Sequence, residues 1–212
     1  MYVPEYFLIK NIDTCHRLIR DHGFGELITV DPEGAPFASH LPFMLDPARG
    51  QFGTLTAHVA RANPQWRHFA SGRAALAIFH GPHAYVSPEW YGTEQAVPTW
   101  NYLAVHAYGV PQIIEDANEV LRYLRALSGA HEAANGTAWR MEGLPEDYLA
   151  RMVKGLVAFE MQISRIEGKA KLSQNRGEED QLSVASALAR SNDPFAQALA
   201  KEMPAKLSLV RA

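Results

Sequence analysis

Short apolar segments alternate with turn signals along the chain, which is the pattern of a β-rich fold. The turn Asp31–Gly34 has Pro at its second position and Gly at its fourth, and it separates two strand-like segments. Near the other end, Val157–Ile163 alternates apolar and polar residues as a half-buried strand does. Strands are expected at residues 26–30, 37–45, 52–58, 74–80, 84–87, 101–114 and 157–163.

Helices are predicted between these strands. Asp13 is a candidate N-cap for a helix over Thr14–His22, and Asn63 with Pro64 is a candidate start for a short helix ending near Ser71. Further helices are expected at residues 117–131 and 146–156 and in the tail from 178, with a last piece starting at 193, whereas residues 88–98 are expected to form an aromatic-rich loop. Six or seven strands in hairpins with inserted helices favour an α+β, mainly β fold, a small antiparallel barrel with peripheral helices.

The bulk properties are those of an ordinary globular chain. Its 212 residues, 47% hydrophobic and 20% charged, suit one domain, with a barrel over residues 1–168 and a basic segment with a helical tail over 169–212. The single cysteine, Cys15, excludes a disulfide within the chain. The first residues have no signal-peptide pattern, and no apolar run reaches the ~18 residues of a membrane span. We therefore expect a cytoplasmic protein.

Charge and histidine spacing narrow the function classes. Twenty basic against 23 acidic residues give a formal net charge of −3, and no helix-turn-helix is evident, so the sequence does not favour binding to nucleic acid. His80 and His83 are the only close histidine pair, and no cysteine cluster or HExxH pattern accompanies them. No metal is expected, and no catalytic residue can be assigned.

The segment His58–Trp66 is the first candidate site. A strand ends at His58, Arg61 follows, and Asn63 with Pro64 starts a helix. A helix start presents unpaired backbone N–H groups and a partial positive charge, and the guanidinium of Arg61 has a forked donor set that suits phosphate. This combination predicts an anion site. The alternative is a solvated arginine beside an ordinary helix cap.

Three other segments carry polar or aromatic side chains of the kinds that bind ligands. Gly168–Arg176 combines three cations with three neutral hydrogen-bonding side chains, or else is an exposed basic turn. Val97–Tyr102 offers aromatic and amide groups to a planar ring, or else belongs to an aromatic core or a subunit interface. His40, in the apolar strand Ala38–Phe43, reads more simply as a core histidine with its hydrogen bonds satisfied.

Taken together, these motifs resemble the PaiB-like family of FMN-binding negative transcriptional regulators. They occur in the family's order over nearly the whole chain. The matching segments are residues 1–4 with Phe7, 39–43, 58–66, 79–91, 97–102 with 105–106, 131–132 with Trp139, and 169–175. His80 departs from the smaller residue expected before Gly81-Pro82.

The resemblance implies a split β-barrel, antiparallel and of Greek-key type, related to pyridoxamine-phosphate oxidases. It also implies a homodimer with FMN in the groove between subunits, and a phosphate held by the turn from His58 to Asn63. The cofactor-binding residues implied are Ser39, His40, Leu41, Pro42, Thr56, His58, Arg61, Asn63, Thr99, Trp100, Asn101, Lys171, Ser173, Gln174 and Asn175. The resemblance implies that some of these residues come from the partner subunit.

Two functions remain open at this stage. One is regulation with FMN as a sensing ligand, for which DNA is a partner by family name only. The other is a flavin-dependent oxidoreductase that uses NADH, NADPH or another small molecule, of the flavin reductase, oxidase or haem-degrading type. A flavin store with neither role is a weaker third reading.

Overall fold

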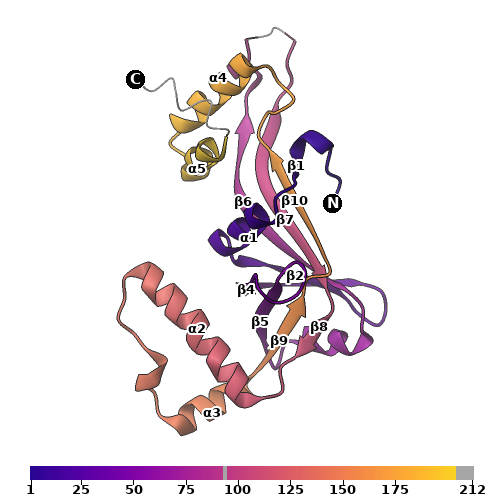
Figure 1. The fold of residues 1–212 in the computed structure, drawn as a ribbon, viewed down its shortest axis with the longest axis vertical. Helices are drawn as coiled ribbons and strands as arrows, with labels where there is room; N and C mark the ends of the chain where they lie inside the picture. The colour runs from indigo at the N-terminus through magenta and orange to yellow at the C-terminus, as the bar shows by residue number, and fades with distance from the viewer. Residues whose placement is uncertain (93–94, 204–212) are drawn as a thin grey trace. The chain divides into compact units, whose positions relative to one another are not determined.

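The computed structural model describes residues 1–92 and 95–203, and the chain divides into two compact units (Figure 1). Unit 1 comprises Met1–Leu18, Phe79–His106 and the chain from Glu167, and unit 2 comprises Ile19–Ile78 and Ala107–Ile166. Residues 93–94 of the predicted aromatic loop and residues 204–212 of the predicted tail lie outside the described residues. Each unit is described by itself below.

Unit 2 contains two sets of antiparallel strands. One set pairs β3 with β2 and β2 with the first residues of β6, and the other has the order β4-β5-β9-β8. The elements are β2 (Phe24–Val30), β3 (Pro36–Pro42), β4 (Met44–Asp46), β5 (Thr54–Ala60), η2 (Pro64–Ser71), β8 (Pro111–Ile113), α2 (Ala117–Asn135), η4 (Met141–Gly143), α3 (Glu146–Lys154) and β9 (Leu156–Gln162).

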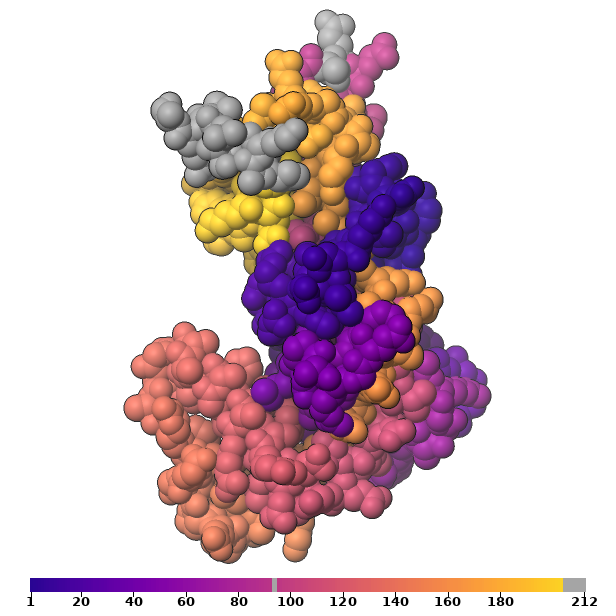
Figure 2. Space-filling view, viewed as in Figure 1, coloured from indigo at the N-terminus to yellow at the C-terminus, as the bar shows by residue number. Residues whose placement is uncertain are grey.

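The core of unit 2 forms on one face of the β5–β9 pair. Leu55, Ala57 and Phe159 are fully buried, and Phe69 of η2 packs on Phe159 with 4.9 Å between ring centroids. Helix α2 buries only its first half, through a cluster that includes Tyr123. Its second half and the chain leading to α3 are largely exposed, and Figure 2 shows them in salmon at the surface.

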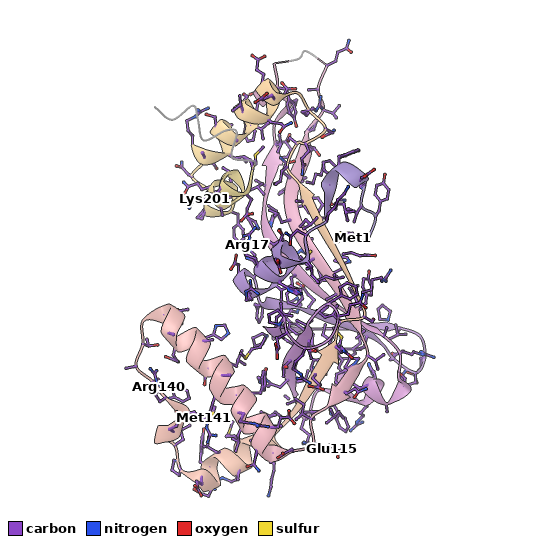
Figure 3. All side chains as sticks on the ribbon, viewed as in Figure 1. Met1, Arg17, Glu115, Arg140, Met141 and Lys201 are labelled. Carbon is purple, nitrogen blue, oxygen red and sulfur yellow. The ribbon has the colours of Figure 1, made fainter. Side chains whose placement is uncertain are left out.

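Unit 1 combines four neighbouring strands in the order β1-β10-β7-β6 with two C-terminal helices. The elements that lie wholly or mostly in this unit are η1 (Glu5–Phe7), β1 (Leu8–Ile9), α1 (Ile12–Asp21), β6 (Ala75–Val86), η3 (Pro88–Trp90), β7 (Thr99–Gly109), β10 (Arg165–Lys171), α4 (Glu178–Ala189) and α5 (Pro194–Glu202). Helices α4 and α5 bury Leu188 and Leu199, and Arg17 of α1 forms a two-pronged ion pair with Glu202 of α5. Figure 3 labels Arg17.

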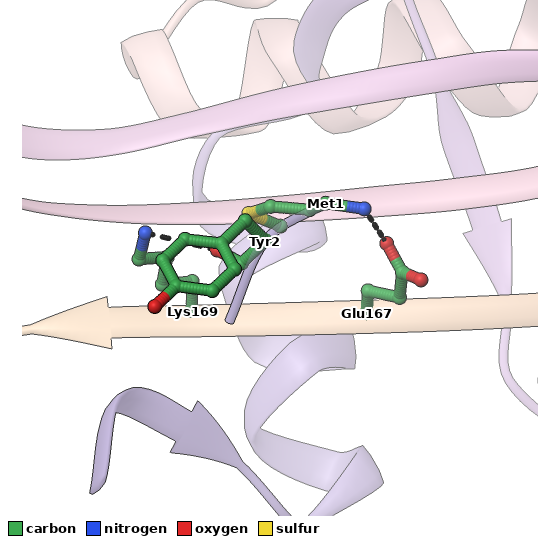
Figure 4. Close-up of polar contacts among 4 residues, drawn as sticks. All are labelled: Met1, Tyr2, Glu167 and Lys169. Atoms are coloured by element: carbon green, nitrogen blue, oxygen red, sulfur yellow. Dashed lines mark hydrogen bonds and ion pairs between the residues drawn. The ribbon is translucent and has the colours of Figure 1, made fainter. Parts of the chain in front are cut away.

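The N-terminal residues lie along β10 (Figure 4). The α-ammonium of Met1 forms an ion pair with the carboxylate of Glu167, and the ammonium of Lys169 donates to the carbonyl of Tyr2 at 3.1 Å. The same ammonium lies 5.8 Å from the centroid of the Tyr2 ring. These contacts hold the first residues against the strand that leads into the predicted basic segment.

The structure corrects the first predicted helix and the predicted strand 37–45. The first helix is Ile12–Asp21, and Asn11 rather than Asp13 caps it, accepting from the backbone N–H of Asp13 at 2.7 Å. The predicted strand 37–45 is two strands, because Phe43 bonds back to Gly23 and the chain then joins β5 in the other set. Such changes of partner depend on distant residues and leave no local pattern.

The strands around residue 80 and residue 168 also differ from the prediction. The predicted strands 74–80 and 84–87 are one strand, β6, which continues through Gly81-Pro82. Proline fits there because β2 pairs only with residues 76–78, so no neighbour on that side needs its missing N–H. Residues 165–171 form strand β10 where the sequence pattern predicted no strand, so the basic segment begins inside a sheet. The short strand β1 was missed as well.

No helix among the described residues is long and apolar enough to cross a membrane. The described part of the chain also has no group of three or more His, Cys, Asp or Glu side chains placed to hold a metal ion.

Candidate functional site

The predicted anion turn in unit 2 is built by the end of β5 and the start of η2. Asn63 caps η2, since its Oδ1 accepts from the backbone N–H of Gln65 at 3.0 Å. Its Nδ2 donates to the hydroxyl of Ser39 on β3 at 2.9 Å. The structure thus brings together Ser39 and Asn63, two residues that the family resemblance assigned to one site from segments 24 positions apart.

Arg61 lies at the same turn with its guanidinium fixed in place. Its Nε donates to the carbonyl of Lys154 at 2.7 Å and its Nη2 to the carbonyl of Leu156 at 2.9 Å. The side chain is exposed, and its Nη1 has no hydrogen bond to any residue in the described ranges. A guanidinium held by two carbonyls presents its remaining donors in a defined direction, which favours binding of an oxyanion.

Gln65 stabilises this turn through buried hydrogen bonds and was not among the site residues predicted from the sequence. It is fully buried, and its Nε2 donates to the carbonyls of Leu27 and Phe37 and to the hydroxyl of Thr29, at 2.8, 3.1 and 3.2 Å. The amide therefore joins η2 to both β2 and β3. A polar residue at the second position of a short helix gives no sequence signal that it will be buried.

His58 and Tyr123 form a polar pair between β5 and α2. His58 Nδ1 lies 3.0 Å from the Tyr123 hydroxyl, and the rings meet edge to face. Burial lowers the pKa of His58 and raises the pKa of Tyr123. Both groups are therefore neutral near pH 7, and His58 offers hydrogen bonds rather than a positive charge to a ligand.

This pair predicts a pH dependence of stability. The folded protein holds His58 neutral at pH values where the unfolded chain protonates it, so the unfolded state binds more protons as the pH falls below about 6.5. The free energy of unfolding should then fall from pH 7 to pH 5, and it should fall less in His58→Gln. Urea titrations across this range measure both slopes.

The control for this prediction is His131→Gln, which removes an exposed histidine of α2 and should leave the slope unchanged. His106 retains part of the dependence in every variant, because burial, and then the N-terminal ammonium, lower its pKa. An identical slope in the His58→Gln variant and the unsubstituted protein contradicts the assignment.

The other predicted residues of unit 2 differ in exposure. His40 is exposed, 3.8 Å from the Glu26 carboxylate and stacked beside Phe24, so its interpretation as a core histidine is wrong. It lies near the end of β3, which is the last strand of its set and turns alternate side chains outward. Leu41 is buried, and Pro42 and Thr56 are half-buried.

In unit 1 the structure joins the two remaining segments. The ammonium of Lys171 at the end of β10 donates to the hydroxyl of Thr99 at the start of β7. Next to it, the buried amide of Asn101 donates to the hydroxyl of Ser173 at 2.9 Å. The residues Thr99, Asn101, Lys171 and Ser173 are called the polar quartet below. Its two pairs come from segments 72 positions apart in the chain.

The loop after β10 is braced by Gln174. Its Oε1 accepts from the backbone N–H of Leu172 at 2.7 Å and its Nε2 donates to the carbonyl of Ala170 at 2.5 Å. Both ends of the side chain are therefore used within the loop, and Gln174 shapes the site rather than facing outward from it. Asn175 is exposed, as is Trp100, whose ring lies 6.1 Å from that of Tyr85.

The anion turn of unit 2 fits the phosphate of a flavin mononucleotide. A fixed guanidinium, an amide and a hydroxyl gather at one turn, which is the donor chemistry that a phosphate requires. In unit 1 the buried Oδ1 of Asn101 has no partner among the described residues, so an N–H donor of a bound molecule would satisfy it.

A cleft of about 580 Å³ in unit 2 lies beside the anion turn. Trp66 lines it and also lines a smaller cavity of about 110 Å³ that includes Arg61. The Trp66 indole donates to the carbonyl of Arg61 at 3.1 Å, so the aromatic ring and the turn are held together. Glu115, labelled in Figure 3, borders both spaces.

Comparison with known proteins assigns the chain to a family. Residues 1–165 match the family described as "Putative FMN-binding domain", and the chain belongs to this family. It is 35% identical over 207 residues to the "Protease synthase and sporulation protein PAI 2" of Bacillus subtilis (strain 168), covering 98% of both chains. An uncharacterised protein of Saccharomyces cerevisiae is 36% identical over 142 residues, covering 57% of this chain and 83% of the other.

Solved structures share the fold at low sequence identity. The flavocytochrome Anf3 of Azotobacter vinelandii superposes with a TM-score of 0.60 at 13% identity, covering 84% of this chain and 77% of the other. The FAD and heme binding protein of Mycobacterium smegmatis gives 0.58 at 16% identity, with 82% and 78% covered. The predictions of an antiparallel split barrel, of FMN as cofactor and of a PaiB-type protein are confirmed.

Proposed function

We propose that the protein is an FMN-binding regulator of the PaiB type, with the flavin phosphate at the turn formed by Arg61, Asn63 and Ser39. The observation that carries the proposal is the 35% identity to the Bacillus subtilis sporulation protein over 98% of both chains. The fixed Arg61 guanidinium and the Asn63–Ser39 contact support the phosphate position. Bound FMN supplies an isoalloxazine ring that takes up and releases electrons, and the chain binds and orients it.

The protein acts as a homodimer in this proposal. The partner is a second copy of the chain. Support comes from an exposed aromatic cluster in unit 1, where His83 contacts Phe195 and Trp100, and Tyr85 contacts Trp100. Clustered exposed aromatics are typical of interfaces. Static light scattering tests the dimer, and a monomer at micromolar concentration contradicts it.

Regulation in this proposal does not depend on direct reading of DNA. Helices α4 and α5 are the one pair of consecutive helices packed on each other at the described C-terminal end, and α4 begins with Glu178, Glu179 and Asp180. This acidic helix start repels DNA phosphates, and the whole chain has a net charge of −3. We therefore infer that the bound flavin, or a protein partner that senses it, carries the signal.

The test begins with mass spectrometry of the ligand released from the purified protein, together with its visible absorption. A colourless protein that takes up no added FMN contradicts the proposal. A gel shift on promoter DNA at two salt concentrations tests direct binding, because phosphate contacts weaken with salt. Stopped-flow mixing with NADH or NADPH tests the oxidoreductase alternative, and rapid, repeated flavin reduction favours that alternative over a regulator.

Arg61→Ala is expected to weaken FMN binding by about 1.5–3 kcal/mol, because a charge-assisted hydrogen bond to the phosphate is lost. Fluorescence titration with FMN measures this change. Arg73→Ala, which removes an exposed arginine after η2, is the matched control and should bind FMN normally. Arg61 also bonds to two carbonyls, so the melting temperature of each variant is measured alongside. An unchanged FMN affinity in Arg61→Ala places the phosphate elsewhere.

A further inference from the structure

Two lysines of β10 lie close together in unit 1 without an acidic partner. Lys169 is buried, with its ammonium 5.2 Å from the centroid of the Tyr102 ring and bonded to the carbonyl of Tyr2. Lys171 follows two positions later, and its ammonium donates to the hydroxyl of Thr99. Tyr102 and Lys169 both influence the pKa of Lys171. The pair concentrates positive charge at a partly desolvated place.

The nearest carboxylate along the strand is engaged elsewhere. Glu167 forms an ion pair with the α-ammonium of Met1 (Figure 4). Neither Lys169 nor Lys171 forms an ion pair with an Asp or Glu among residues 1–92 and 95–203. Burial is the main cause of the lowered pKa of Lys171, and the repulsion from Lys169 adds to it. Buried charges in proteins are normally paired with an opposite charge. The two lysines at the end of β10 therefore favour the binding of an anion.

The polar quartet also has hydrogen-bonding capacity that the chain does not use. Ser173 accepts from Asn101, which leaves its own hydroxyl hydrogen to be donated. Ser173 is held at φ 65°, the one positive φ outside glycine in the described part of the chain. A non-glycine residue in this conformation is uncommon and often marks a functional position.

We propose that the polar quartet binds the anionic group of a second small molecule, distinct from FMN, with Lys171 as the charged ligand. The group is a phosphate or a carboxylate, because an ammonium, a threonine hydroxyl and a serine hydroxyl together offer donors of the kind both groups accept. Lys169 contributes positive charge to the site without contacting the bound anion, because its side chain is buried. That the molecule is not FMN itself rests on the proposed function, in which Arg61 holds the single phosphate of the flavin.

The experiment uses full-length protein saturated with FMN and two probes, inorganic phosphate and oxalate, titrated in a calorimeter. The two probes distinguish a phosphate-bearing from a carboxylate-bearing ligand. We expect at least one to bind, with affinity reduced about tenfold or more in Lys171→Met. Thr99→Val, which keeps every charge, should weaken binding several-fold. Lys201→Met removes an exposed lysine from α5, labelled in Figure 3, and should bind like the unsubstituted protein.

Three results overturn the proposal. The first is the absence of binding by both probes to the unsubstituted protein at about 10 mM. The second is unchanged probe affinity in both Lys171→Met and Thr99→Val, whose native folds are checked by melting temperature. The third is displacement of FMN by the probes, with Lys171→Met losing FMN as Arg61→Ala is expected to do. That result assigns the flavin phosphate to Lys171, whereas the first two leave the proposed FMN site intact.

Discussion

Replacing Gln65 by Leu is expected to lower the free energy of unfolding by about 2–4 kcal/mol. The side chain is fully buried, and its Nε2 donates to two carbonyls and one hydroxyl of β2 and β3. Leucine has a similar volume but no donor, so the substitution leaves these acceptors short of a partner in a place that water does not reach. Urea denaturation followed by tryptophan fluorescence measures the change.

The same substitution should weaken FMN binding even in the fraction that remains folded. Gln65 ties η2 to β2 and β3, and its backbone N–H is the group that Asn63 caps. Loosening that tie displaces Asn63 relative to Ser39, and the phosphate turn loses its geometry. Gln112→Leu, an exposed glutamine of β8, is the control and should change stability by less than about 0.5 kcal/mol. Equal stability of the two variants contradicts a structural role for Gln65.

Gly109→Ala is expected to cost about 3 kcal/mol or more, because the space for a side chain is already occupied. A Cβ at Gly109 would overlap the carbonyl oxygen of Gln162 and lie 2.7 Å from Cγ of Met161. The carbonyl belongs to the backbone at the end of β9, so it cannot move aside as the tip of a flexible side chain can. Relief of this clash requires β7 and β9 to separate, which disturbs the buried face around Met161.

Gly129→Ala is the matched control for this prediction. Gly129 lies within α2, and a Cβ built there meets no atom within 4 Å. Alanine loses less backbone entropy than glycine when a helix forms, so this variant should be more stable by about 0.5–1 kcal/mol. Thermal melting of both variants tests the pair of predictions together. A Gly109→Ala protein as stable as the unsubstituted one means that the strands do not approach as closely as described.

Much of the local structure was predictable from the sequence because it depends on neighbours along the chain. Asn63 and Pro64 start η2 as expected, and Pro194 starts α5 after the Asp193 cap. These signals act within one turn of helix, where a side chain meets backbone groups two or three positions away. The first helix shows the limit of such signals, because Asn11 and Asp13 are both good caps and the chain uses Asn11.

The candidate site was predictable in its parts and not in its assembly. The sequence pointed to Arg61, Asn63 and Ser39 through their motifs, but only the fold showed that Asn63 contacts Ser39 and that two carbonyls fix Arg61. The polar quartet was likewise foreseen as separate segments. Tyr123 was not foreseen, although it lies in a correctly predicted helix, because its hydroxyl meets His58 across 65 positions of sequence.

The sequence alone therefore determined most of the helices and strands, with β1 and β10 missed, and the family to which the chain belongs. The tertiary structure alone decided that residues 37–45 divide between two sets of strands, that His40 faces outward and that Lys169 and Lys171 share one strand without a carboxylate partner in the described residues. The physical reason is distance along the chain. Caps and turns are satisfied by near neighbours, whereas burial, strand pairing and the pairing of charges depend on residues that only the complete fold brings into contact.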